Sequence, residues 1–379
     1  MDVGSQAAAP VTPRAGHSPL HLLGHGAETY TVEVMGLEGF HKRGLVETTS
    51  TGRMWRLEAD EGTYLRGTNL APAPLMYWGA GLHADILTRV AAAARERGVT
   101  LTSLSGTVRQ GFAATGSFVR AQAVAKVFDL RIDVAVDGAA TPAELDALVA
   151  HAIATSPAVA AVATAREGRF GLHSNGRPTA VHGIPALHGA PAVDPLRKYA
   201  EVPEPTDEQL GDVVGFEPGH PDRTHVVTDD SDGAVEFHVE ARGKLDPRLG
   251  TVRTTVGFPE VTGDRWSLLS DPADTVAPSP LAYFSIGTAF CYHTQLCRYV
   301  AVRRLPLERA RLTQVSRFEI DRTRATADPL ATHVFLNGRC EDAQTTALMT
   351  LAANICYAHR ALASNVEVSF GVDATARVH

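Results

Sequence analysis

Cysteine is scarce and unevenly placed in this chain of 379 residues. All four cysteines, Cys291, Cys297, Cys340 and Cys356, lie after residue 290. A disulfide scaffold would need cysteines spread along the sequence, so we expect free thiols in a reducing compartment. The sequence also contains no Cys-x-x-Cys pair, which speaks against a zinc ribbon.

Long hydrophobic runs and an excess of positive charge are missing as well. The longest apolar run, 281–290, is about half the roughly 20 residues that a membrane-spanning helix needs. Near the N-terminus the apolar run 20–23 is much shorter than a signal-peptide core. The net charge is −7 and the arginines are dispersed, which favours neither nucleic acid nor an anionic membrane as a partner. We therefore expect a cytoplasmic protein that binds neither of them.

The composition is that of an ordinary globular protein. Hydrophobic residues make up 44% of the chain and charged residues 20%, which leaves enough apolar side chain for a buried core. The length suggests more than one domain, and two is the starting expectation.

An internal repeat supports two units. Residues 71–81, APAPLMYWGAG, align without a gap with residues 277–287, APSPLAYFSIG. The alignment pairs two prolines, Tyr77 with Tyr283, and Gly81 with Gly287. Repeated segments of this kind indicate a repeated structural unit.

The same order of elements is predicted in both copies. Each has an upstream hairpin, a long helix, two strands, a second helix and a closing strand. In the first copy Thr141, Pro142 and Glu144 form a capping-box signature that marks the second helix. The predicted strands lie at 30–34, 53–59, 101–112, 124–136 and 166–172 in the first copy, and at 235–240, 265–269, 310–321, 333–337 and 366–372 in the second.

These predictions define an α+β architecture of two similar units. We expect a flexible N-terminus (1–26), a first unit (27–173), a linker rich in Pro, Gly, His and Asp (174–233), and a second unit (234–379). Each unit would place an antiparallel sheet against a long central helix.

The second unit resembles the OsmC/Ohr (osmotically inducible and organic hydroperoxide resistance) family. The resemblance rests on Pro280 followed eleven residues later by Cys291, on the segment 303–308, and on Cys356-Tyr-Ala-His359-Arg360. It covers about 235–372, and more faintly 30–172. It implies that Cys291 is the peroxide-reacting thiol and Cys356 the resolving one. Family members form intertwined dimers, so the resemblance also implies a dimer fused into one chain.

The alignment shows departures from the family pattern. In the first copy Asp85 replaces Cys291 and Ser156 replaces Cys356, so that copy lacks thiol chemistry. The family glutamate that follows the proline is Leu281 in the second copy. Three residues are candidates for the family's catalytic arginine: Arg43, Arg242 and Arg248.

Helical spacing selects further site residues. Gln295 and Arg298 share the helix face of Cys291, and Arg298 is the better thiolate neighbour, whereas His293 points away. Cys297 lies about 240° around the helix from Cys291 and is predicted to be a packing residue, as is Cys340. Asp85 is a candidate general acid or base. Candidate substrate contacts are Tyr283, Gln295 and His359, although His359 and Arg360 also fit a solvated helix end.

The two-residue spacings Cys291/His293 and His83/Asp85 are poor metal-ligand geometry on a helix, so we expect no metal and no other cofactor. Three functions remain open. The first is a peroxidase-like oxidoreductase that uses Cys291, Cys356, an organic hydroperoxide and a dithiol reductant. The second is a scaffold recruited to another reaction on a small organic substrate, for example in specialised metabolism. The third is a non-catalytic binder of an apolar ligand. The protein would be a monomeric pseudo-dimer or a homodimer.

Overall fold

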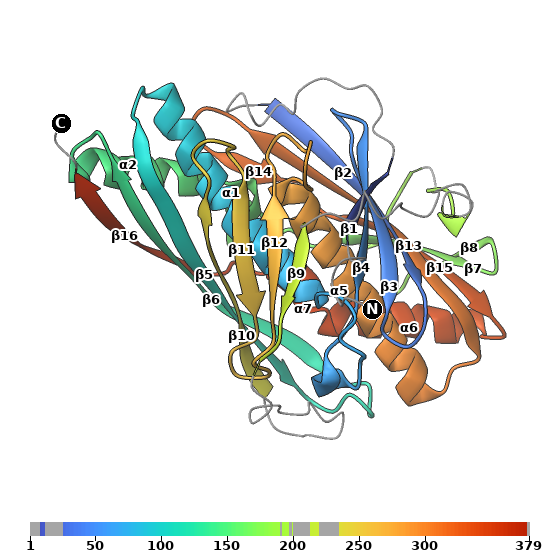
Figure 1. Cartoon of the computed structure of the whole chain (residues 1–379). Coiled ribbons are helices and arrows are strands. Elements are labelled where there is room, and N and C mark those ends of the chain that lie inside the picture. Colours follow the sequence, from blue (N-terminus) through green and yellow to red (C-terminus); the bar gives the residue numbers. More distant parts are fainter. Residues whose placement is uncertain are drawn as a thin grey trace.

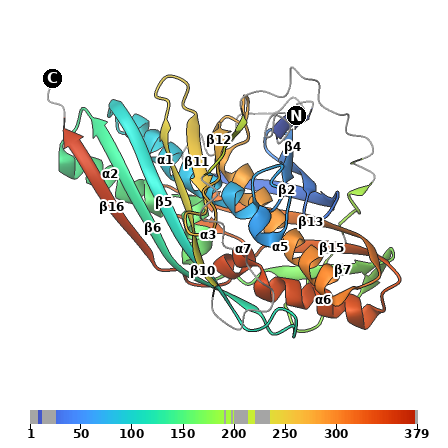
Figure 2. The ribbon, with the colours of Figure 1, turned by 60° about the horizontal axis from the view of Figure 1, so that its bottom comes forward.

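Two β-sheets enclose two long helices in this protein (Figure 1). The computed structural model describes residues 8–11, 26–189, 192–196, 199, 213–219 and 235–376. Helix α1 (Pro74–Glu96) packs on one sheet, helix α5 (Pro280–Arg303) packs on the other, and the two helices pack against each other. The layers therefore run sheet, helix, helix, sheet, and Figure 2 shows them from a second direction. The predicted α+β class is confirmed.

Each sheet combines strands from both sequence units. The first sheet has, in order, β1 (Ala8–Val11), β4 (Arg53–Ala59), β3 (Lys42–Thr48), β2 (Gly26–Gly36), β13 (Leu307–Ile320), β15 (Ala331–Gly338), β7 (Arg169–Ser174) and β8 (Arg177–Thr179), with β14 (Ala325–Ala327) beside β13. The second has β16 (Val368–Ala376), β6 (Val124–Gly138), β5 (Leu101–Thr115), β10 (Val235–Leu245), β11 (Val252–Gly257), β12 (Arg265–Ser270) and β9 (Val214–Glu217).

The exchange of strands follows the same plan in both sheets. Strand β2 pairs antiparallel with β13, and β10 pairs antiparallel with β5, so the hairpin of one unit extends the sheet of the other. The closing strands are exchanged too, because β7 runs parallel to β15 and β16 runs parallel to β6. Neither of the ranges 27–173 and 234–379 therefore builds a complete sheet from its own strands.

Close contact between α1 and α5 depends on the repeated glycines. A Cβ atom on Gly81 would lie 2.4 Å from the backbone nitrogen of Phe284, and one on Gly287 would lie 2.5 Å from that of Trp78. Real Cβ atoms do not approach backbone so closely. Only glycine at these two positions allows the helix backbones to meet, which explains why the repeat contains it.

Each unit also contains a broken second helix. Helix α2 (Pro142–Ala154) begins with the predicted capping box at Thr141 and is followed by α3 (Pro157–Ala163). Helix α6 (Asp342–Ile355) is followed in the same way by α7 (Tyr357–Leu362). Ser156 caps the start of α3, and Cys356 lies between α6 and α7. These two junctions bring the candidate residues of the broken helices toward α1 and α5.

The expectations for the N-terminus and the linker are partly wrong. Residues 8–11, expected to be flexible, form β1 and pair with β4. The linker supplies β8 and β9, which extend the two sheets. Its Asp194 also binds Arg311 of β13, with the two nitrogen–oxygen distances at 2.7 and 2.6 Å. Strand pairing and this ion pair thus tie parts of both segments to the sheets, and the rest of 1–26 and 174–233 lies outside the described residues.

In the described part of the chain no single helix is long and apolar enough to cross a membrane. Helices α2 and α3, which form a bent pair, reach that length and composition only when they are taken together.

Candidate functional site

The structure brings Cys291 and Cys356 together. Cys291 lies on α5, Cys356 lies where α6 passes into α7, and the two thiols are close enough to interact electrostatically. Both cysteines are free and buried. Burial and the neighbouring Cys291 raise the pKa of the Cys356 thiol well above its usual value. Because Cys356 also begins α7, it is not simply at the end of a helix as the sequence suggested.

A small cavity of about 50 Å³ adjoins Cys291. Gln295 and Arg298 line it from the same helix face, as their spacing predicted. Its other walls come from both sequence units: Glu61, Tyr64, Leu65, Ala73, Pro74, Leu75, Phe237, Phe258, Val261 and Tyr357. The volume admits a few atoms beside the thiol, and the apolar and aromatic walls exclude bulk water.

Positive charge is directed at this cavity by the backbone. The cavity is lined by Ala73, Pro74 and Leu75, which are the N-cap and first residues of α1. The first turn of a helix carries unsatisfied N–H groups and the positive end of the helix dipole. An anion such as a thiolate is stabilised at that end.

A buried lysine adds a second positive group. Lys42 of β3 is 0% exposed, and its Nζ has no hydrogen-bond acceptor among the described residues. Burial lowers the pKa of Lys42, while the charges of Glu61, Cys297, Asp60 and Cys291 oppose that shift. Lys42 is therefore close enough to interact electrostatically with the Cys291 thiol.

Glu61 supplies a carboxyl group to the same cavity. It accepts hydrogen bonds from the hydroxyl groups of Tyr64, at 2.7 Å, and Thr294, at 2.8 Å. Burial raises the pKa of Glu61, and the charge of Lys42 opposes this shift. Glu61 thus lines the cavity and interacts with Lys42, and two hydroxyl donors hold its carboxylate.

Arg298 is fixed at the opposite side of the cavity. Its Nη1 donates to Oε1 of Gln295 at 3.2 Å, and its guanidinium lies 4.1 Å from the ring centroid of Phe118. The hydrogen bond and the cation–π contact both restrict the side chain. Gln295 and Arg298 consequently form one polar group along the helix beside Cys291.

His359 lies behind Cys356, outside the residues that line the cavity. Its Nδ1 is 3.1 Å from the sulfur of Cys356, and its Nε2 is 3.2 Å from the amide nitrogen of Gln314. With the Gln314 amide oriented so that its nitrogen faces the ring, Nε2 accepts and the ring proton is assigned to Nδ1. Burial lowers the pKa of His359 to about 3, so the ring is neutral at pH 7. The neutral ring therefore donates its Nδ1–H to the sulfur of Cys356.

Several candidates named from the sequence lie elsewhere. The hydroxyl of Tyr283 donates to the carbonyl of Leu269, and its ring stacks on Tyr77 at the helix interface, away from the cavity. His293 points away from Cys291, as predicted, and its Nδ1 lies 3.5 Å from the sulfur of Cys297. Tyr283 therefore serves in packing, and not as a wall of the thiol cavity.

The two remaining cysteines are separate from the thiol pair. Burial raises the pKa of Cys297 to about 11, which keeps this thiol protonated at neutral pH. Cys340 precedes Glu341, the N-cap of α6, and burial raises its pKa as well. Neither cysteine lines the cavity beside Cys291.

None of the three candidate arginines lines the thiol cavity. Arg43 binds Glu58, Arg242 binds Glu240, and Arg248 is exposed. The cation is instead Lys42, one residue before Arg43, on the opposite face of β3. Sequence reasoning missed Lys42 and Glu61. The sequence could have indicated Lys42, because it alternates with Gly44 and Val46 and so lies on the same, inward-facing side of the strand.

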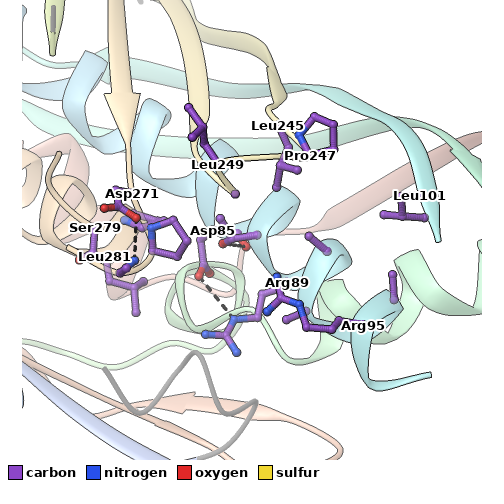
Figure 3. Close-up of a pocket in the computed structure, with 18 of the residues that line it drawn as sticks. Asp85, Arg89, Arg95, Leu101, Leu245, Pro247, Leu249, Asp271, Ser279 and Leu281 are labelled. Carbon is purple, nitrogen blue, oxygen red and sulfur yellow. Dashed lines mark hydrogen bonds and ion pairs between the residues drawn. The ribbon is translucent and has the colours of Figure 1, made fainter. Parts of the chain in front are cut away.

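A different pair occupies the corresponding place in the first unit. Ser156 donates to Oδ2 of Asp85 at 2.6 Å, and the backbone N–H of Ala158 donates to the same oxygen at 3.2 Å. Arg89, one turn further along α1, places its Nε 3.8 Å from Oδ1 of Asp85 (Figure 3). Burial raises the pKa of Asp85, and Arg89 opposes the shift. A cavity of about 400 Å³ adjoins this pair.

The two cavities exchange the starts of the long helices. Leu281 lines the cavity of Asp85, whereas Leu75, its counterpart in the repeat, lines the cavity of Cys291. Each cavity is therefore completed by the first turn of the long helix from the other unit. The carboxyl group near the thiol comes from Glu61.

The structure thus has a mixed α+β fold with a buried thiol pair. No family model and no curated protein matches the sequence. Among solved structures, the chain is similar to an OsmC-like hydroperoxide resistance protein from Jannaschia sp. CCS1, at 20% identity and a TM-score of 0.26. The aligned part covers 40% of this chain and 97% of that protein.

Proposed function

We propose that this protein is a thiol-dependent oxidoreductase that reduces an organic hydroperoxide, with Cys291 as the nucleophile and Cys356 as the resolving thiol. The observation that supports it is the proximity of these two buried thiols at a cavity lined by Glu61, with Lys42 close enough to interact with Cys291. Neighbouring thiols can form a disulfide where their Cβ atoms approach to about 3.5–4.5 Å.

The order of the two thiols follows from their surroundings. Burial and the neighbouring Cys291 raise the pKa of Cys356. Cys291 adjoins the cavity and the first turn of α1, and Lys42 interacts with it electrostatically. Cys291 is therefore the thiol that a substrate in the cavity would meet, and positive charge lies near it, which suits a nucleophilic cysteine.

The proposed reaction has two oxidative steps and one reductive step. The Cys291 thiolate attacks one oxygen of the hydroperoxide, the O–O bond breaks, and the alkoxide leaves as an alcohol after taking up a proton. Cys291 is then a sulfenic acid. The Cys356 sulfur attacks it, water leaves, and a Cys291–Cys356 disulfide forms. A dithiol returns both cysteines to thiols and is itself oxidised to a disulfide.

Each part of the cavity has a role in this scheme. The apolar walls Phe237, Phe258 and Tyr357 suit the organic part of a hydroperoxide, and Gln295 and Arg298 suit its oxygens. His359 donates its Nδ1–H to Cys356, which favours negative charge on the resolving sulfur. Lys42 and Glu61 would take the roles that the family resemblance gives to an arginine and a glutamate.

We further propose that the chain arose as a fused pair of similar units and acts as a monomeric pseudo-dimer. The two sheets have the same order of corresponding strands, and each cavity takes residues from both units. The thiol cavity is thus built within one chain. Its free cysteines fit a reducing compartment such as the cytoplasm.

Consumption of cumene hydroperoxide with dithiothreitol as the reductant tests the proposal. Wild type should turn over, Cys291→Ser should lose turnover, and Cys356→Ser should stop after one equivalent. Cys340→Ser is the matched control, because this thiol lies outside the cavity. Peptide mapping after mild oxidation should find a Cys291–Cys356 disulfide. Absence of turnover by wild type, or full turnover by Cys291→Ser, would contradict the proposal.

A further inference from the structure

The cavity beside Asp85 is larger than the thiol cavity and has no role in the proposed thiol reaction. Its volume of about 400 Å³ falls within the range of small-molecule sites, roughly 300–1,000 Å³. Leu245, Leu249 and Leu281 form apolar walls, and Asp85, Arg89 and Arg95 add charged groups (Figure 3). Apolar walls with a few polar groups are typical of a ligand site.

Arg89 is the polar group with unused hydrogen-bonding capacity. It is 7% exposed, and its Nε has no hydrogen-bond acceptor among the described residues. Its ion-pair distance of 3.8 Å to Asp85 is longer than a hydrogen bond. A buried guanidinium with five N–H donors strongly favours acceptor oxygens, and a carboxylate fits its planar fork with two parallel bonds.

The carboxylates at this cavity already have donors. Oδ2 of Asp85 accepts from Ser156 and Ala158. Asp271 accepts at Oδ1 from the backbone of Ala273, and at Oδ2 from the backbone of Thr275 and Val276 and from the hydroxyl of Thr275. Three of these four oxygens accept hydrogen bonds within the protein, and Oδ1 of Asp85 has only the 3.8 Å contact with Arg89. The unused groups of Arg89 are donors, which select an electron-rich ligand.

The start of α5 adds a second, independent attraction for negative charge. Ser279, Pro280 and Leu281 line the cavity, and they are the N-cap and first residues of this 24-residue helix. The positive end of a helix stabilises an anion there. The start of α1 has the same position beside Cys291. At the cavity of Asp85, however, no cysteine lies where the helix start could stabilise a thiolate.

We propose that this cavity binds a small amphipathic carboxylic acid. Its carboxylate would lie on the guanidinium of Arg89, beside the first turn of α5. Its apolar part would contact Leu245, Leu249 and Leu281. The site is separate from the thiol pair, so binding there does not require the proposed thiol reaction.

Isothermal titration calorimetry with octanoate tests this site, with 1-octanol as the neutral probe of the same chain length. Octanoate should bind at one site and at least about tenfold more tightly than octanol, since a charge-assisted bidentate pair exceeds about 1.4 kcal/mol. Arg89→Gln should weaken octanoate by about the same factor and leave octanol unchanged. Arg97→Gln, an exposed position at the end of the same helix, is the matched control.

A second variant tests the same site if Arg89→Gln does not fold. Leu249 lines the cavity but is 74% exposed, so Leu249→Glu adds a negative charge without disturbing the core. It should weaken octanoate severalfold more than octanol. The proposal is overturned by any of three results: no saturable octanoate binding, equal affinity for octanoate and octanol, or octanoate binding that neither variant changes.

Discussion

The hydroxyl of Ser156 donates a hydrogen bond of 2.6 Å to the carboxylate of Asp85. In the other half of the chain, Cys356 at the junction of the broken helix and Cys291 on the long helix α5 are close enough to interact electrostatically. One backbone arrangement therefore holds an acid–hydroxyl pair at one place and a thiol pair at the other. Local side-chain chemistry, and not the fold, separates the two sites.

Substitution of the crossing glycines should destabilise the protein. In Gly81→Ala the new methyl group would lie 2.4 Å from the Phe284 nitrogen and 2.6 Å from the Pro280 oxygen, so α1 and α5 must separate. We expect a net loss of about 1–3 kcal/mol in the free energy of unfolding, after a gain of up to about 1 kcal/mol in helix propensity. Urea unfolding measures it. The control is Gly215→Ala, whose nearest neighbour would be 3.7 Å away, and an equal effect there would contradict the explanation.

Removal of the buried lysine should slow the chemistry of Cys291 without unfolding the protein. Lys42→Met keeps most of the side-chain volume and removes an ammonium that has no acceptor among the described residues. We expect severalfold slower alkylation of Cys291 by iodoacetamide at pH 7, because the thiolate loses a nearby positive charge. Thermal stability should fall, because the buried Glu61 loses the positive charge of Lys42. Mass spectrometry of the Cys291 peptide measures the rate, with exposed Lys126→Met as the control. An unchanged rate would exclude Lys42 as a partner of the thiol.

His359 should act on the second step only. His359→Leu removes the Nδ1–H that contacts the Cys356 sulfur at 3.1 Å, but it leaves the walls of the Cys291 cavity intact. After one equivalent of hydroperoxide, the sulfenic acid of Cys291 should therefore persist about tenfold longer and be trapped by dimedone. Formation of the sulfenic acid should keep its rate. Arg360→Gln, the next residue, is the control. If the first step slowed instead, His359 would have a role that the geometry does not suggest.

How far the sequence predicts this molecule depends on which contacts are local. The repeat identified α1 and α5, the prolines that begin them and the glycines at their crossing, since these follow from short sequence patterns. Helical spacing also placed Gln295 and Arg298 beside Cys291. The exchange of strands between units is a tertiary property, so the repeat could not show which cavity the start of each long helix lines. For the same reason Lys42 and Glu61, which reach the thiol from the other unit, were missed.

A buried histidine should make stability depend on pH in a defined window. Burial lowers the pKa of His83 to about 4, whereas an unfolded histidine titrates near 6.5. Between these values the unfolded state binds the extra proton, so stability is present above pH 6.5 and is lost as the pH falls toward 4. His83→Gln should lower the slope of unfolding free energy against pH by up to about 1.4 kcal/mol per pH unit in this window. Urea unfolding between pH 4 and 7 measures it. The exposed His188→Gln should leave the slope unchanged.

The equivalence of the two half-sites can be tested by rebuilding the thiol pair in the first unit. Asp85→Cys with Ser156→Cys places two thiols where a carboxylate and a hydroxyl are now in contact. Removal of Asp85 alone would leave Arg89 buried without its carboxylate, at a cost of about 3–5 kcal/mol. Arg89→Gln is therefore added, which reproduces the Gln295 of the other unit at the corresponding helix position.

The triple variant should form a disulfide between its two introduced thiols on mild oxidation with diamide, because the present side chains at these positions are in contact and a disulfide joins Cβ atoms about 3.5–4.5 Å apart. Non-reducing peptide mapping detects that bond independently of Cys291 and Cys356. A variant with Asp85→Cys and Arg89→Gln alone keeps Ser156, so its new thiol should stay reduced. If the triple variant folds and its new thiols remain unpaired, the two helix junctions are not equivalent. The acid–hydroxyl pair would then have a geometry of its own, and its resemblance to the thiol pair would be limited to the order of the elements.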